Sequence, residues 1–446
     1  MPSIRPFRAL RYSREQVEDL SKVVAPPYDV VSPEAHRALL ARDPRNVVRL
    51  DLPDEQAGDP PDEKYRRAAH TLSAWRSDGT LRRDVRPALY PYEQVFRVPG
   101  TDRVETRRGV FARVVLEPFG PSSGIRAHER TLAAPREDRY RLLRATAVNT
   151  SPVVGIGEDR SGTVAEWLRD VAATEPAARL VDDAGVTHRL WVAAVGVDET
   201  RDATIGAVCE RLGASPITLA DGHHRYETAL RYAEERRRGP VVEDSPAWNE
   251  ILMLILEPVE GPLTVLPTHR VLLGCDGSQV ASFVDRTTEL FEVETGIERE
   301  ELVAAFDGSS EVRGGEGRFG LWTRHGGAIL RARRGAFAPW LPPGGTAVRR
   351  LDVTLASVAI ERLAGIDPAA VAAGRLAFTM SAAEAVRWVD AGVSPSGGQP
   401  ASIALLLEPT PAAEIVAVAA DGDVMPQKST YIYPKALTGL VINPLE

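Results

Sequence analysis

Apolar and polar positions along the central part of the chain follow a pattern that predicts strands and helices in turn. Apolar runs bounded by turn residues predict strands, and helical spacing of apolar positions predicts the helices between them. The expected strands are 189–197, 217–220 and 251–257, and the expected helices are 203–212 and 225–238. Because the links are short, this order favours a mixed or parallel α/β layer. The apolar run 263–270 is expected to add a strand to the same layer.

The flanking parts of the chain add further elements. Ser32-Pro33-Glu34 combines a capping residue, a first-turn proline and an acidic residue, which is typical of a helix start. The remaining expected elements are helices over 61–78, 135–147 and 352–363, a β-hairpin or meander over 88–116 and a buried strand over 401–407.

These elements predict an α/β or mixed α+β fold, with a mixed sheet core covered by helices and a smaller inserted α+β lobe. At 446 residues the chain is long enough for two or three lobes. The expected division is an N-terminal α+β region 1–155, an α/β core 156–278, an inserted lobe 279–350 and a C-terminal region 351–446 that completes the core.

The turn Asp221-Gly222-His223-His224-Arg225 has more side chains suited to bind anions or to move protons than any other segment of its length. It joins an apolar strand to a helix, and a helix N-terminus offers unpaired N–H groups and a partial positive charge to an anion. Gly222 permits the turn, Asp221 is suited to cap the helix or hold a metal, and the other three side chains bind anions or move protons. A plain capped turn is the alternative. Phosphate binding with proton transfer is favoured over metal ligation, because neighbouring histidines on a tight turn cannot easily face one ion.

Other polar segments are candidate walls of the same cleft. His128-Glu129 is either a surface charge cluster or a site in which Glu129 is a base or a metal ligand. Thr268-His269-Arg270 follows an apolar strand, where polar residues often line a cleft. Tyr28-Asp29, beside Pro26-Pro27, forms either a loop with a purely structural role or a rigid wall of a ligand-binding site. Lys428-Ser429-Thr430 fails the phosphate-loop pattern, because Gln427 stands where glycine is required and an extended segment follows; Lys428 and Lys435 remain candidate point charges.

Composition excludes several classes of function. The chain has 54 basic and 62 acidic residues and a net charge of -8, which argues against a nucleic-acid binder that neutralises phosphates. Neither a signal peptide nor a membrane-spanning stretch is visible, so a soluble, cytoplasmic protein is expected. The two cysteines lack metal-ligand spacing. Oligomeric state stays open.

The chain resembles the bacterial and archaeal family catalogued as domain of unknown function 1015. The motifs that carry this resemblance run from one terminus to the other: 4–10, 25–31, 128–129, 221–225, 266–270 and 425–430. The turn 221–225 is also similar to the phosphate-binding turn of the ParB and sulfiredoxin superfamily, which includes free-serine kinases. That second resemblance implies a ParB/sulfiredoxin-like core and a link to serine metabolism. A histidine replaces the sulfiredoxin cysteine, so sulfinic-acid repair is not supported.

The leading hypothesis is a phosphotransferase that moves a phosphoryl group between ADP or ATP, with Mg²⁺, and a small hydroxylated metabolite, best serine or phosphoserine. The alternatives are a non-catalytic nucleotide- or nucleic-acid-binding regulator of ParB-like type and a metal-dependent hydrolase. The expected catalytic residues are Asp221, His223, His224 and Glu129, with Asp221 or Glu129 as the Mg²⁺ ligand. The expected phosphate contacts are Gly222, His224, Arg225 and Lys428, and the expected substrate contacts are Tyr28, Asp29, His128, Thr268, His269 and Arg270.

Overall fold

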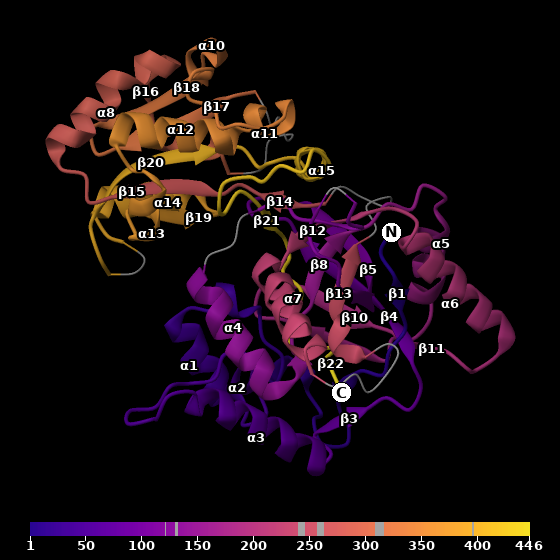
Figure 1. The fold of residues 1–446 in the computed structure, drawn as a ribbon. Coiled ribbons are helices and arrows are strands. Elements are labelled where there is room, and N and C mark those ends of the chain that lie inside the picture. Colours follow the sequence, from indigo (N-terminus) through magenta and orange to yellow (C-terminus); the bar gives the residue numbers. More distant parts are fainter. Residues whose placement is uncertain (121, 130–132, 240–245, 257–262, 308–315, 395–396) are drawn as a thin grey trace.

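The chain folds into two lobes, each built on its own β-sheet (Figure 1). The computed structural model describes residues 1–120, 122–129, 133–239, 246–256, 263–307, 316–394 and 397–446. Both lobes combine sheets with helices, so the predicted mixed α/β fold is confirmed. Among the described residues, no helix combines the length and the apolarity that crossing a membrane requires.

The first lobe holds a ten-stranded mixed sheet in the order β6-β12-β8-β13-β5-β4-β10-β9, with β1 beside β5 and β11 beside β4. The pairing is mixed, since β12 runs parallel to β6 and antiparallel to β8, while β13 runs parallel to β8 and antiparallel to β5. The strands are β1 Ile4–Arg5, β4 Ala88–Arg97, β5 Val104–Val115, β6 Ile125–Arg126, β8 Val153–Ile156, β9 Ala178–Val181, β10 Thr187–Leu190, β11 Ala193–Ala194, β12 Ile217–Asp221 and β13 Glu250–Leu256.

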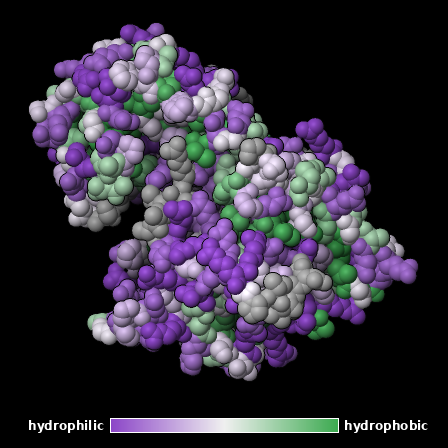
Figure 2. Space-filling model, in the orientation of Figure 1, coloured by the Kyte–Doolittle hydropathy of each residue, from purple (hydrophilic) through white to green (hydrophobic). Residues whose placement is uncertain are grey.

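Helices surround this sheet and confirm most of the expected helical segments. Ser32 caps α1 as predicted, because its side chain accepts a hydrogen bond from the Ala35 N–H. The helices of the first lobe are α1 Pro33–Arg42, α2 Val48–Asp51, α3 Glu63–Ser77, α4 Ala133–Thr146, α5 Thr163–Ala172, α6 Glu199–Leu212 and α7 His223–Arg237. Hydrophilic side chains cover the face around α4 and α7 (Figure 2).

The second lobe is a six-stranded antiparallel sheet in the order β16-β18-β17-β20-β15-β19. Alternate residues of β15 and β20 enter two different apolar clusters, so both faces of this sheet are buried. Its strands are β15 His269–Leu273, β16 Phe291–Ile297, β17 Arg318–Thr323, β18 Gly326–Ala332, β19 Leu376–Thr379 and β20 Ala401–Leu407. Its helices are α8 Gly277–Leu290, α9 Arg299–Ala305, α10 Arg334–Phe337, α11 Thr346–Arg350, α12 Asp352–Ala364, α13 Pro368–Ala372, α14 Ala382–Ala391 and α15 Ala412–Ala420.

The second lobe is larger than the expected insertion of residues 279–350. Strands β15, β19 and β20 lie outside that range and belong to its sheet. The run 263–270 therefore does not extend the first sheet: β14 (Val265–Leu266) pairs with β21 (Tyr431–Ile432), and β15 enters the second sheet. Apolar spacing predicts a buried strand but does not identify which of two sheets receives it.

The C-terminal segment returns to the first lobe after β20. Strand β22 (Asn443–Pro444) pairs with β7 (Val148–Asn149), and single bridges join Ile442 to Leu10 and Thr438 to Ala25. The small pair β2 (Leu10–Tyr12) and β3 (Leu81–Arg83) lies beside this return. The C-terminus of the chain thus completes the first lobe.

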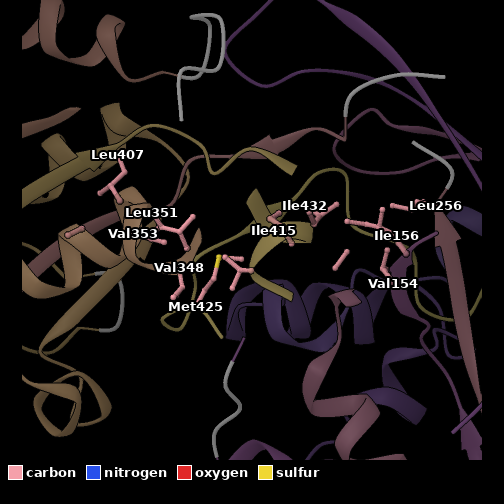
Figure 3. Close-up of a cluster of buried hydrophobic side chains, with 14 of the residues drawn as sticks. Val154, Ile156, Leu256, Val348, Leu351, Val353, Leu407, Ile415, Met425 and Ile432 are labelled. Atoms are coloured by element: carbon pink, nitrogen blue, oxygen red, sulfur yellow. The ribbon is translucent and has the colours of Figure 1, made fainter. Parts of the chain in front are cut away.

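One apolar cluster connects the two lobes (Figure 3). Its side chains run from Val154 and Ile156 of the first sheet, through Ile432 on β21, to Val348 and Leu407 of the second lobe. Such buried contacts stabilise the packing of one lobe on the other. The segment that carries Met425 lies within this cluster, next to the candidate site.

Candidate functional site

The candidate site lies where β12 ends and α7 begins. Asp221 is the last residue of β12, and Gly222 has a φ of 89°, a left-handed conformation that glycine adopts without strain. A Cβ at Gly222 would lie 3.1 Å from the Arg225 guanidinium. Helix α7 then starts at His223, so the predicted strand, turn and helix are present.

Asp221 is held between two cations instead of capping α7. One carboxylate oxygen accepts a hydrogen bond from Arg225 at 2.5 Å, and the other accepts one from the Lys435 ammonium. The N-cap residue of α7 is Gly222, which has no side chain to cap the first turn.

Charge rather than burial decides the ionisation of Asp221. Burial alone would raise the pKa of its carboxyl, but Lys435 and Arg225 hold that pKa well below its usual range. Burial opposes the charge on Lys435 as well, yet Asp221 and Asp29 raise the pKa of Lys435. All three groups are charged at neutral pH.

His128 and His223 form a buried pair beside this centre. Their rings meet edge to face with centroids 4.6 Å apart, and His223 Nε2 accepts a hydrogen bond from the His128 backbone N–H at 3.3 Å. His128 Nδ1 lies 2.5 Å from the Leu219 carbonyl, which can only accept, so Nδ1 carries the proton and Nε2 accepts from the Thr430 hydroxyl at 3.1 Å. Burial lowers the pKa of His128 to about 4 and that of His223 well below its usual value. Both rings are neutral at pH 7.

Glu129 is a carboxyl group whose protonation changes near neutral pH. Burial raises the pKa of Glu129 to about 7, although its Oε1 accepts a hydrogen bond from the Lys428 N–H at 2.5 Å and the charges of Lys428 and Lys435 oppose the shift. Glu129 also forms a bridge with Met425, which ties it to the C-terminal segment. A carboxyl group with this pKa is suited to take up and release a proton.

Tyr28, Asp29, His224 and Lys428 complete the rim. Asp29 and Lys428 are exposed, and the charge of Asp29 raises the pKa of both Lys435 and Arg225. His224 is half-buried, and burial lowers its pKa. The Tyr28 ring lies 4.3 Å from the Arg139 guanidinium. These side chains come from three distant parts of the sequence.

The predicted contacts Thr268, His269 and Arg270 divide between two environments. His269 is completely buried in the second sheet, and its Nδ1 accepts a hydrogen bond from the Leu407 N–H at 3.1 Å. Thr268 is also buried. Arg270 instead reaches back towards the rim, and its Nη2 lies 3.4 Å from the Lys428 carbonyl.

Sequence reasoning missed Arg107 and Tyr431. The half-buried Arg107 guanidinium donates to the Gln94 side chain and to the Tyr433 and Pro434 carbonyls, which fixes the backbone just before Lys435. The Tyr431 ring lies 4.6 Å from the Lys435 ammonium. An arginine at an inward position of β5 is the sequence signal that could have identified Arg107.

The side chains of this site give little support to a metal ion bound by protein ligands alone. Within the part of the chain that the structure describes, no three His, Cys, Asp or Glu side chains gather closely enough to hold one. Both carboxylate oxygens of Asp221 already accept hydrogen bonds from cations. Mg²⁺ at Asp221 would have to displace Lys435 or Arg225.

Comparison with known proteins identifies a family and only distant structural likenesses. Residues 4–354 match the family described as "Protein of unknown function (DUF1015)". No curated protein matches the chain. A conserved hypothetical protein from Pyrococcus furiosus is similar at a TM-score of 0.34 and 12% identity, over 72% of this chain and 89% of that one. Free serine kinase in complex with AMP is similar at 0.35 and 11%, over 72% and 86%, and a mutant with ADP at 0.35 and 12%, over the same shares.

Proposed function

The chain belongs to the DUF1015 family, whose description names no activity, and from its own residues we propose that it is a phosphotransferase. In this proposal it moves a phosphoryl group between ADP or ATP and a small hydroxylated metabolite. Serine and phosphoserine are the first candidates for that metabolite. The proposal rests on the site at Asp221–Arg225.

The observation that carries the proposal is a helix start that has glycine as its N-cap residue and is surrounded by cations. The N-cap residue Gly222 offers no side-chain cap to α7, and Arg225, Lys435 and Lys428 lie around this helix start. Backbone N–H groups at a helix N-terminus bind phosphate, and neighbouring cations neutralise its charge. Phosphoryl transfer depends mainly on such positioning and charge neutralisation.

Glu129 supplies the proton chemistry in this proposal. A hydroxyl group that attacks phosphorus must lose its proton, and the Glu129 carboxylate can accept it above its pKa of about 7. Asp221 is less suited to this role, because its two salt bridges keep its pKa low. Asp221 instead holds Arg225 and Lys435 in place.

The nucleotide brings any magnesium in this proposal. Mg²⁺ commonly binds proteins through nucleotide phosphates and few carboxylates. Asp29 is an exposed carboxylate at the rim, where it can contact a substrate amine or hydroxyl. Tyr28 and His224 form the neighbouring wall.

The direct test incubates the purified protein with Mg²⁺, serine and ADP or ATP and follows phosphoserine by mass spectrometry. The reverse reaction starts from phosphoserine and the complementary nucleotide. Expected results are product in at least one direction and loss of product in K435M. The matched control is K22M, which replaces a lysine of the 3-10 helix Leu20–Lys22, outside the site.

A binding measurement separates a wrong acceptor from a wrong function. Calorimetric titration should give ADP an affinity at least about tenfold higher than adenosine, because charge-assisted phosphate contacts contribute about 1.5–3 kcal/mol each. Nucleotide binding without phosphoserine formation would reject serine as the acceptor. Absence of both product and nucleotide binding would refute the proposed function.

A further inference from the structure

The second lobe contains a cavity of about 460 Å³ that the proposed phosphoryl transfer does not use. Its walls come from α12, α13, β15, β19 and the segment 424–427. Protein sites for small organic molecules have volumes of roughly 300–1,000 Å³. The cavity reaches the surface beside Trp340, which is 47% exposed.

Most of the cavity wall is apolar. Its apolar lining includes Val348, Val358, Ile360, Val371, Phe378 and Met425. Such a surface favours an apolar ligand body over water, because apolar surface gains free energy when it leaves water. A freely hydrated sugar or nucleoside phosphate does not match this lining.

Five polar residues interrupt the apolar wall: Arg270, Thr354, Ser357, Glu361 and Gln427. Glu361 is exposed to solvent, the Ser357 hydroxyl already donates to the Val353 carbonyl at 2.9 Å, and only Arg270 and Thr354 are buried. Arg270 lines the cavity and is only 2% exposed; Thr354 also lines it, and its hydroxyl is buried with no hydrogen-bond partner in the described residues. A buried polar group without a partner is costly, so a ligand atom that pairs with it gains free energy.

The charge of Arg270 has no carboxylate partner within the described ranges. Its guanidinium donates to the Thr268 and Lys428 carbonyls, and the charge of Glu129 acts on it without an ion pair. Burial lowers the pKa of Arg270 to about 10, which leaves it charged at neutral pH. Buried cations are normally paired with an anion. A buried, charged guanidinium on the wall of an apolar cavity therefore calls for an anionic group on the ligand.

We propose that this cavity binds a small carboxylic acid with an apolar body. Arg270 pairs with the carboxylate, Thr354 offers a further hydrogen bond, and the apolar wall holds the body. A carboxylate fits better than a phosphate, because a single buried cation neutralises one negative charge and a dianion is more costly to remove from water.

This site is separate from phosphoryl transfer, although the two are neighbours. The segment that contributes Met425, Pro426 and Gln427 to the cavity continues into Lys428, whose N–H binds Glu129. The Met425 N–H also donates to the His128 carbonyl at 2.7 Å. The proposal stands or fails independently of the phosphotransferase.

The test is calorimetric titration of the full chain with 3-phenylpropionate and with its uncharged amide. The acid should bind at least about tenfold more tightly than the amide, and R270M should remove this difference. V371W should abolish binding of both by filling the cavity. V181W, at a 50%-exposed position of the first lobe, is the matched control and should leave both affinities unchanged.

Several results would overturn the proposal. These are equal binding of acid and amide to the unmodified protein, unchanged binding in V371W, binding of phenyl phosphate without 3-phenylpropionate, and displacement of the bound acid by ATP. The last result would assign the cavity to the nucleotide. If R270M does not fold, the comparison of acid with amide and the V371W variant still decide the question.

Discussion

Substitution of Asp221 by Asn should destabilise the first lobe strongly, because it leaves two cations without their anion. The Asp221, Arg225 and Lys435 side chains are only 12%, 12% and 13% exposed. Removing one partner of a buried ion pair costs about 3–5 kcal/mol. At about 2 °C per kcal/mol for a lobe of this size, the melting temperature should fall by about 6–10 °C.

The double variant D221N/K435M tests whether the unpaired charge causes this loss. Removing the lysine charge as well should restore part of the stability, with a coupling free energy of about 1–3 kcal/mol. Arg225 keeps its hydrogen bond to the Pro152 carbonyl in both variants. The unfolding transition of the first lobe, followed by calorimetry and by urea titration, gives the free energies.

The matched control is D102N, which removes an exposed carboxylate from its ion pair with Arg97 at 2.7 Å. Exposed pairs contribute little, so its melting temperature should change by about 2 °C or less. Equal effects of D221N and D102N, or a D221N/K435M variant as unstable as the sum of its single variants, would refute the argument.

The pH dependence of stability provides a second check. Because the folded pKa of Asp221 is lowered, its contribution is present above the ordinary carboxyl pKa and is lost as the pH falls towards the folded value.

Three further predictions concern the same site. E129Q should reduce phosphoryl transfer about 10²–10⁴-fold and remove the rise in rate through pH 7, as measured by initial rates across pH, and an unchanged profile would exclude Glu129 as the base. G222A should lower the free energy of unfolding by about 1 kcal/mol or more and weaken ADP binding, because alanine is strained at a φ of 89°. Calorimetry that gives the wild-type stability and the wild-type ADP affinity would contradict this. H128Q should reduce the loss of stability between pH 6.5 and 4. The folded pKa of His128, about 4, lies below the unfolded value, so the unfolded chain binds more protons in that range and the wild-type protein loses stability as the pH falls. Urea titrations in which the free energy of unfolding changes equally with pH in both proteins would disprove this.

The local sequence was sufficient to predict the turn at the centre of the site. An apolar strand, a glycine and a helical pattern in succession predict β12, the left-handed Gly222 and α7, because strand spacing, steric freedom and helix periodicity are properties of neighbouring residues. The same local logic predicted the Ser32 cap and the extended segment at Tyr431–Ile432.

Local patterns could not predict how the two strands after residue 262 are shared between sheets. His269 and Arg270 are adjacent in β15, and successive strand residues point to opposite faces. His269 is therefore completely buried in the second sheet, while Arg270 lines a cavity. The spacing of apolar residues is the same whichever sheet receives the strand, so only the packing of the whole chain decided it.

The sequence by itself determined the mixed α/β class and the residue types of the Asp221–Arg225 turn. Only the tertiary structure decided that Asp221 meets Lys435, 214 positions further along, and that Glu129 meets the Lys428 backbone. The charge state of both carboxyl groups follows from this packing, since burial and nearby charges shift a pKa while sequence distance does not: two cations lower the pKa of Asp221, and burial raises that of Glu129 against the opposing Lys428 contact. Asp221 and Glu129 are both acidic residues in the sequence, but Asp221 is held ionised by two cations, whereas the pKa of Glu129 is raised to about 7, so that its protonation changes near neutral pH.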